Sequence, residues 1–144
     1  MKKILICVRS IVRPWIYFGI TWLIVVLIGF LLSNIFPDDW GAAWVNFILS
    51  MGVYLIVLHP IMSLICSKRM YADTCGSIWF VFYQGVVFAI EFCFLTSGGL
   101  FLNFSNPDYL RNTIIIFITA ILWGIVFPLG YYIYKKIMKT ENTD

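Results

Sequence analysis

The chain has 144 residues, of which 62% are hydrophobic, 19% are aromatic and only 12% are charged, and its formal net charge at pH 7 is +3. An ordinary soluble domain has about 45–50% apolar and about 25% charged residues, so this composition argues against a soluble enzyme, a disordered segment and a disulfide scaffold. The basic excess is too small and too dispersed for a nucleic-acid-binding surface, and the class that remains is a small integral membrane protein.

Four stretches of the chain are long and apolar enough to cross a bilayer as helices, which takes about 20 predominantly apolar residues. The connections at 37–41 and 67–73 are short and carry turn-forming or charged residues, and the connection at 97–111 is longer. We therefore expect an all-α polytopic membrane protein, in which four transmembrane helices form a compact bundle and a single domain. The predicted spans are residues 14–36, 42–66, 75–96 and 112–134.

Residues 1–13 are expected to form a separate N-terminal segment. At about 100° per residue, Lys2, Arg9 and Arg13 gather on one side of a helix, and apolar residues occupy the opposite arc. This pattern is typical of a basic amphipathic helix that lies along the lipid headgroups, with Pro14 starting the first span. The alternative is that these are ordinary basic residues flanking a span.

The basic residues also predict the orientation of the chain. Nine of them fall in the N-terminal segment, the connection at 67–73 and the tail at 135–144, and Arg111 alone falls on the other side. Because cytoplasmic flanks carry the Lys/Arg excess, we expect both termini in the cytoplasm of a bacterial cell and the spans in its inner membrane. Trp15 and other aromatic residues near the span ends are interpreted as interfacial anchors. The nine basic residues are Lys2, Lys3, Arg9, Arg13, Lys68, Arg69, Lys135, Lys136 and Lys139.

The sequence contains no recognisable apparatus for catalysis or for cofactor binding. A single histidine cannot supply two axial ligands to a haem or build a histidine-rich metal site. The four cysteines form no C-x-x-C pair, and neither a glycine-rich phosphate loop nor a nucleophile elbow occurs. We therefore expect a protein that is not an enzyme and that carries no metal or cofactor.

Ionisable residues within a span each cost about 2.5–3.5 kcal/mol on insertion scales, so Glu91 and His59 mark the candidate site. Counted at 1.5 Å per residue, Glu91 lies about 21 Å from the inner boundary, level with one polar residue in the second span and one in the fourth. In the third span a polar residue recurs every seven positions, which places these residues on one helix face. The candidate intramembrane residues are Glu91, Gln84, Ser77, Ser50, Thr119 and His59.

Two interpretations of Glu91 remain open. Because hydrocarbon disfavours the charged carboxylate, Glu91 is expected to be neutral and to donate a hydrogen bond to Ser50 or Thr119, which would clasp the helices together. Alternatively, Glu91 is a proton or cation site, or the residue that a partner helix recognises. For His59 the expected partner is a lipid headgroup or Gln84.

Small residues and prolines predict how the spans pack. Small residues at four-residue spacing let two helix backbones approach closely, so the third and fourth spans are expected to form an antiparallel hairpin. Proline removes a backbone N–H and bends a helix, which predicts kinks at Pro60 and Pro128. The small residues are Gly85 and Ala89 in the third span and Ala120 and Gly124 in the fourth.

In its size, four spans, inward termini and minimal loops, the chain resembles the small inner-membrane immunity and entry-exclusion proteins, with which bacteria and their conjugative elements block an incoming pore-former or mating apparatus. This resemblance implies a non-enzymatic recognition protein that acts by binding a partner membrane protein. Specificity would then come from intramembrane polar residues such as Glu91 and Gln84, from the connection at 97–111, or from the basic ends of the spans.

Two alternatives follow from the same features. A four-span chain with one membrane glutamate and many aromatic residues is also similar to the small multidrug resistance exporters, which implies proton-coupled transport with Glu91 as the exchange site. Their glutamate lies in the first span, whereas Glu91 lies in the third. The other alternative is an accessory subunit of a larger membrane complex, in which the polar residues serve helix packing. The lipid bilayer is a partner in every case, and self-association is compatible with all three.

Overall fold

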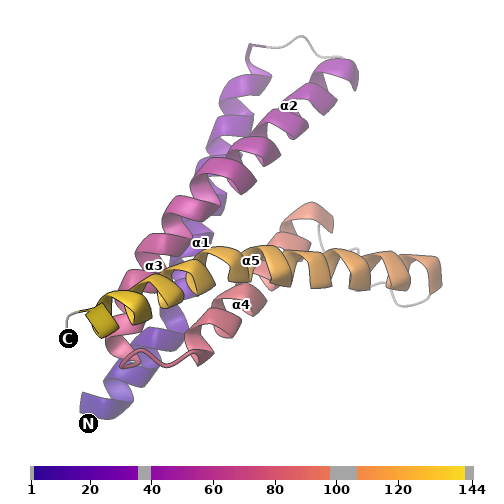
Figure 1. Ribbon diagram of the computed structural model, residues 1–144. Coiled ribbons are helices and arrows are strands. Elements are labelled where there is room, and N and C mark those ends of the chain that lie inside the picture. Colours follow the sequence, from indigo (N-terminus) through magenta and orange to yellow (C-terminus); the bar gives the residue numbers. More distant parts are fainter. Residues whose placement is uncertain (1, 36–39, 98–106, 142–144) are drawn as a thin grey trace.

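The structure is a computed structural model that describes residues 2–35, 40–97 and 107–141. Within this part of the chain every regular element is a helix, which confirms the all-α expectation there. α2, η1 and α3 follow one another without a break, so the chain forms four helical rods (Figure 1). The elements are α1 (Lys2–Ser33), α2 (Trp40–Val53), the π-helical turn η1 (Tyr54–Leu58), α3 (His59–Asp73), α4 (Trp79–Ser97) and α5 (Pro107–Glu141).

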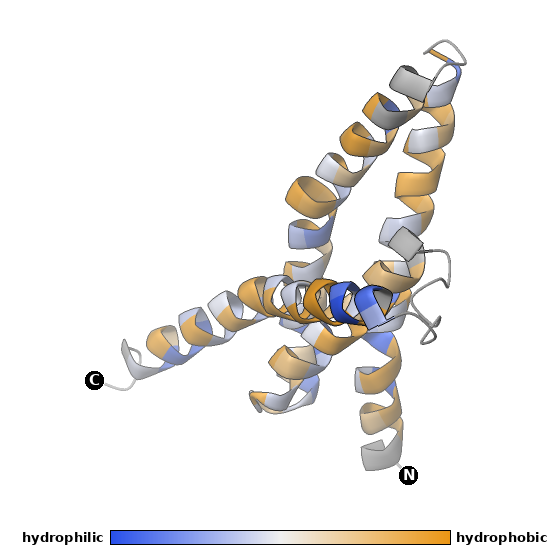
Figure 2. Cartoon of the chain, turned by 90° about the vertical axis from the view of Figure 1, so that its right-hand side faces the viewer, coloured by the Kyte–Doolittle hydropathy of each residue, from blue (hydrophilic) through white to orange (hydrophobic). Residues whose placement is uncertain are grey.

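Three of the four rods are long and apolar enough to cross a membrane, over Leu5–Ser33, Val45–Asp73 and Leu110–Thr140. The fourth rod, α4, is a shorter apolar helix of 19 residues. At 1.5 Å per residue it is about 28 Å long, against a hydrocarbon core of about 30 Å. Apolar residues run along the whole length of the rods (Figure 2), and many large ones, such as Leu23 and Ile56, are exposed. The chain is therefore a membrane protein whose four rods fit a four-helix bundle.

The rods form two antiparallel hairpins that cross each other, α1 with α2–α3 and α4 with α5 (Figure 1). The hairpins lie together where α3 turns into α4 and around Tyr132 of α5, because side chains of these three helices share one buried cluster. They separate toward the tip of the α1–α2 hairpin, which lies far from α4 and α5 in both views (Figures 1 and 2). We call these two parts the closed end and the open end. The bundle that was expected to be compact throughout is thus compact only toward its closed end.

Specific polar contacts hold the closed end together. Arg13 of α1 forms an ion pair with Asp73 at the end of α3. The indole N–H of Trp15 donates a hydrogen bond of 3.0 Å to the hydroxyl of Tyr83 in α4. That hydroxyl in turn donates a hydrogen bond of 2.8 Å to the carbonyl of Ile11. The first half of α1 is therefore tied at this end to α3 of its own hairpin and to α4 of the other.

The structure differs from the sequence prediction at the start of the first span. α1 passes through Pro14 without interruption, so residues 2–13 and the first predicted span are one continuous helix. Pro14 is buried, and its missing N–H deprives only the carbonyl of Ser10 of its helical donor. A helix can tolerate this loss at one position, and Pro14 is therefore not a helix start.

The two other membrane prolines behave differently from each other. Pro60 lies in the first turn of α3, directly after η1, and cannot bond to the carbonyl of Ile56. The N–H of His59 bonds instead to the carbonyl of Tyr54, which is the i to i−5 pattern of a π-turn. This wider turn brings the rings of Tyr54 and His59 to the same side, with their centroids 6.5 Å apart. Pro128, in contrast, lies inside the continuous helix α5.

Glycines bring α4 and α5 into direct contact. A Cβ atom added to Gly124 would lie 2.9 Å from the Cα atom of Gly85, closer than Cβ atoms normally come to any atom. Ala89 and Ala120 are buried in the same apolar core. The four small residues that the sequence singles out therefore lie at the crossing of these two helices, where larger side chains would force the backbones apart.

The contact at Gly124 predicts that two glycines of α5 differ in how much a larger side chain destabilises the protein. Gly124→Val is expected to destabilise the protein by about 1–3 kcal/mol, because overpacking a tight contact displaces the neighbouring backbone. Gly130→Val is the matched control, since a Cβ atom at Gly130 would meet nothing within 4 Å. The thermal unfolding midpoint in detergent, followed by circular dichroism, measures both. Equal midpoints for the two variants would contradict the close packing of α4 on α5.

Candidate functional site

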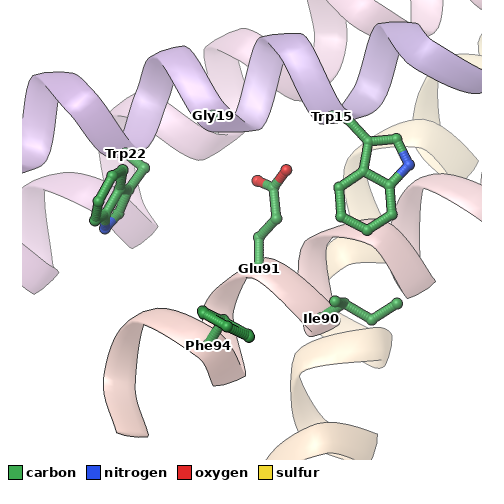
Figure 3. A pocket seen from close by; sticks show the side chains of 6 residues that line it. All are labelled: Trp15, Gly19, Trp22, Ile90, Glu91 and Phe94. Atoms are coloured by element: carbon green, nitrogen blue, oxygen red, sulfur yellow. The ribbon is translucent and has the colours of Figure 1, made fainter. Parts of the chain in front are cut away.

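A cavity of about 500 Å³ lies between α1 and α4. Its walls are almost wholly apolar, and Glu91 is the one charged residue among those that line it. Figure 3 shows the Glu91 side chain extending from α4 toward α1, into the space between two indole rings. We call this cavity the Glu91 groove. Its lining residues are Trp15, Gly19 and Trp22 from α1, and Ile90, Glu91 and Phe94 from α4.

The α1 wall follows from the spacing of three residues. Trp15, Gly19 and Trp22 recur at four and three positions, so they share one face of the helix. A Cβ atom added to Gly19 would meet nothing within 4 Å, so the missing side chain is what leaves the middle of this face open. Trp15 is also held in place from the opposite wall, because its indole N–H bonds to Tyr83 of α4.

One oxygen of the Glu91 carboxyl group, Oε2, has no polar partner within the described residues. Oε2 is buried and forms no hydrogen bond within the described residues. A buried polar atom without a partner costs about 1–3 kcal/mol, and more if the group is charged. The groove therefore combines apolar aromatic walls with one carboxyl oxygen that a cation or a hydrogen-bond donor would satisfy.

Gln84 lies two turns before Glu91 on α4 and faces the α1–α3 hairpin as Glu91 does. Its side-chain Nε2 donates a hydrogen bond of 3.0 Å to the hydroxyl of Ser67, and both residues are buried. Ser77, one further heptad back, precedes α4 and is exposed. Its backbone N–H bonds to the carbonyl of Thr74 in the turn, so it does not belong to the helix face that the spacing predicts.

Ser50 does not reach Glu91. Its hydroxyl donates a hydrogen bond of 3.1 Å to the side-chain carbonyl of Asn46, and Asn46 bonds to the carbonyl of Gly29 at 2.9 Å. Ser50 is buried against Gly29, whose added Cβ atom would lie 3.5 Å from the serine hydroxyl. It therefore serves the contact between α1 and α2, in the part of that hairpin that diverges from α4.

Thr119 lies near the level of Glu91 but on another side of α4. The contact between Gly85 and Gly124 sets the antiparallel register of α4 and α5, and counting outward from it places Thr119 within about one residue of the Glu91 level. Thr119 nevertheless lines a different cavity, and its hydroxyl bonds to the carbonyl of Ile115 at 2.8 Å. The predicted hydrogen bond from Glu91 to Ser50 or Thr119 is thus not formed.

His59 sits in a buried cage of aromatic rings. Its ring centroid lies 3.8 Å from that of Phe88, 5.4 Å from Phe18 and 5.8 Å from Phe127. Neither ring nitrogen has a hydrogen-bond partner within the described residues, so the expected bond to Gln84 is absent. No group of three or more potential metal ligands occurs among the residues that the structure describes.

The sequence prediction missed the α1 side of the groove. Trp15 was interpreted as an interfacial anchor, and Gly19 and Trp22 were not singled out. The signal was present in the chain as a Trp, Gly and Trp on one face of the first span. The connection at 97–111, another predicted contributor to specificity, falls largely outside the described residues.

No protein-family model, curated protein or solved structure matches this chain. The features that bear on function are therefore the geometry of the Glu91 groove and the apolar surface of the four rods.

The aromatic cage predicts that His59 is replaceable. His59→Phe removes two unpartnered buried nitrogens without breaking a hydrogen bond, so the unfolding midpoint in detergent is expected to stay the same or rise. Gln84→Leu is the comparison variant, because it breaks the bond to Ser67 and should cost about 1 kcal/mol. A larger loss of stability for His59→Phe than for Gln84→Leu would show that the imidazole has a partner.

Proposed function

We propose that the protein is a non-enzymatic membrane protein that binds a positively charged group at the Glu91 groove, from within the bilayer. The observation that carries this proposal is the buried, unpartnered Oε2 atom of Glu91. Within hydrocarbon, a carboxyl group gains more from a cationic partner than it would in water, because the low dielectric strengthens the attraction. The apolar walls of the groove complement the apolar part of whatever carries the charge.

The membrane setting supports the same proposal. With the four spans and cytoplasmic termini that the sequence predicts, the closed end, with its Arg13 and Asp73 pair, would lie at the inner surface of the membrane. The nine basic residues against Arg111 alone favour this orientation. The groove then opens sideways toward lipid, beyond the interfacial region, so that its ligand arrives through the bilayer.

The alternative role for Glu91, a polar clasp between helices, receives no support from the contacts around it. A clasp requires a bonded partner on a neighbouring helix, and the two candidates, Ser50 and Thr119, bond elsewhere. The glycine contact instead holds α4 to α5, the Arg13–Asp73 pair holds α1 to α3, and the bond from Trp15 to Tyr83 joins α1 to α4. Glu91 is therefore free for a ligand.

Two kinds of protein would use such a site. In a recognition protein of the immunity or entry-exclusion type, the cationic group belongs to a partner membrane protein that docks against the exposed apolar faces of the rods. In a small proton-coupled transporter, the cation is a solute that exchanges with a proton on Glu91. The single carboxyl group beside two tryptophan rings also supports a transporter, because indole faces attract cations.

The accessibility of Glu91 from the lipid phase tests the proposal. Dicyclohexylcarbodiimide, a lipid-soluble reagent for protonated carboxyl groups, is expected to modify Glu91 in membranes that contain the protein, as measured by the mass of the modified peptide. Gly19→Leu should reduce this modification severalfold, because the new side chain fills the open middle of the groove. Gly130→Leu should leave the modification unchanged, because a Cβ atom at Gly130 meets nothing within 4 Å. If Glu91 stays unmodified in the unaltered protein, the groove is closed to lipid and the proposal fails.

A further inference from the structure

Two neighbouring lysines near the end of α5 lie over tyrosine rings. The ammonium group of Lys136 is 5.0 Å from the centroid of the Tyr132 ring, and that of Lys135 is 5.9 Å from the centroid of the Tyr131 ring. A cation within about 6 Å of an aromatic ring centroid is attracted to the face of the ring. Each lysine follows its tyrosine by one helical turn, and we call these four residues the Lys–Tyr cluster.

The tyrosines of this cluster are fixed by contacts with α3 and α4. The Tyr71 ring near the end of α3 lies 6.0 Å from the Tyr131 ring and 6.3 Å from the Tyr132 ring, measured between centroids. Tyr132 is only 9% exposed and also packs against Phe80 of α4. Tyr71 lies against the turn before α4, because a Cβ atom added to Gly76 would be 3.0 Å from its hydroxyl oxygen. The rings that hold the two ammonium groups are therefore a rigid part of the closed end.

The positive charges of the cluster are not neutralised within the described residues. Neither Lys135 nor Lys136 has a carboxylate partner there, and the carboxylate of Asp73 is already paired with Arg13. Lys136 is exposed and Lys135 is half-buried. Two like charges on adjacent residues repel each other, so an anion that contacted both would relieve this repulsion and form charge-assisted hydrogen bonds.

An exposed apolar stripe on α5 leads from Lys136 toward the middle of the membrane. Its residues are Leu122, Val126 and Ile133, each about half exposed or more. At about 100° per residue, these three residues and Lys136 fall within about 80° of one another, so they share one face of the helix. Lys136 follows the fourth predicted span, residues 112–134, and so lies at the level of the lipid headgroups. This face thus offers cationic groups at one end and apolar contact along its length, which is the pattern that a phospholipid complements.

We infer that the Lys–Tyr cluster is a binding site for an anionic phospholipid, whose phosphate group contacts Lys135 and Lys136 and whose acyl chain lies along the apolar stripe. Basic residues at the ends of membrane helices bind anionic headgroups in this way. The site is separate from the Glu91 groove and does not depend on the function proposed for it. A lipid bound there would hold the closed end at the membrane surface.

Native mass spectrometry of the full chain in mild detergent tests the inference. The probe is dioleoylphosphatidylglycerol, and zwitterionic dioleoylphosphatidylcholine is the comparison lipid. We expect the anionic lipid to bind about tenfold or more tighter. The double variant Lys135→Gln/Lys136→Gln should weaken its binding about tenfold or more, because each lysine near an anionic headgroup contributes to the affinity. Arg9→Gln/Arg69→Gln removes the same charge from exposed positions of α1 and α3 and should change the affinity by less than about threefold.

Three outcomes would overturn the inference. Equal affinity for the two lipids would show that the anionic headgroup is not recognised. Equal weakening by the two double variants would show that net charge alone attracts the lipid. Displacement of the lipid by an equal concentration of inorganic phosphate would show that the cluster recognises free phosphate without an acyl chain. The comparison of the two lipids decides the matter in the unaltered protein even if a variant does not fold.

Discussion

The free energy of holding a carboxyl group in hydrocarbon is the constraint on which this account depends. A membrane-buried charge or polar group needs a partner inside the protein, because lipid provides none. Several polar side chains of the rods meet this requirement locally. Thr21 and Thr119 bond to carbonyls of their own helices, and Gln84 bonds to Ser67. Buried polar atoms of Tyr54, His59 and Ser63 have no bond within the described residues, and neither has Oε2 of Glu91. Among these residues only Glu91 carries a carboxyl group, and it lines a cavity.

The arrangement of the two hairpins explains why Glu91 lines an open groove without a polar partner for Oε2. At the closed end the hydrogen bond from Trp15 to Tyr83 ties the two hairpins together, and the ion pair of Arg13 with Asp73 joins α1 to α3 within one hairpin. Away from that end they diverge (Figure 1), and the Glu91 groove lies between α1 and α4. Gly19 contributes because its missing side chain keeps this space open. The groove is thus a consequence of how the hairpins cross, and not of any one helix.

Much of the architecture was predictable from the sequence because hydrophobicity and the spacing of small residues act locally. The long apolar stretches predict the helical rods, and the glycine and alanine pairs predict the contact between α4 and α5. The heptad spacing places Gln84 and Glu91 on one face of α4, and depth counting places Thr119 near the level of Glu91. These inferences need only the rise and period of a helix.

The partners of these residues were not predictable in the same way. Depth along a helix is fixed by counting, but the direction in which Glu91 faces depends on how the hairpins cross, which single-helix geometry does not determine. Ser50 is directed to Gly29 because α2 stays with α1 where that hairpin diverges from α4. The π-turn before Pro60 shifts the register of the second rod, and His59 enters an aromatic cage instead of reaching Gln84. Pro14 remains inside a helix because one missing hydrogen bond does not outweigh the continuity of α1.

Cysteine cross-linking tests most directly whether Glu91 faces α1 across the groove. In a chain whose four native cysteines have been replaced, Gly19→Cys combined with Glu91→Cys should be joined within one molecule by a short bifunctional reagent in native membranes. Combining Glu91→Cys with Ser50→Cys or with Thr119→Cys should give little product. Efficient linkage of position 91 to position 50 or 119, with none to position 19, would contradict the account.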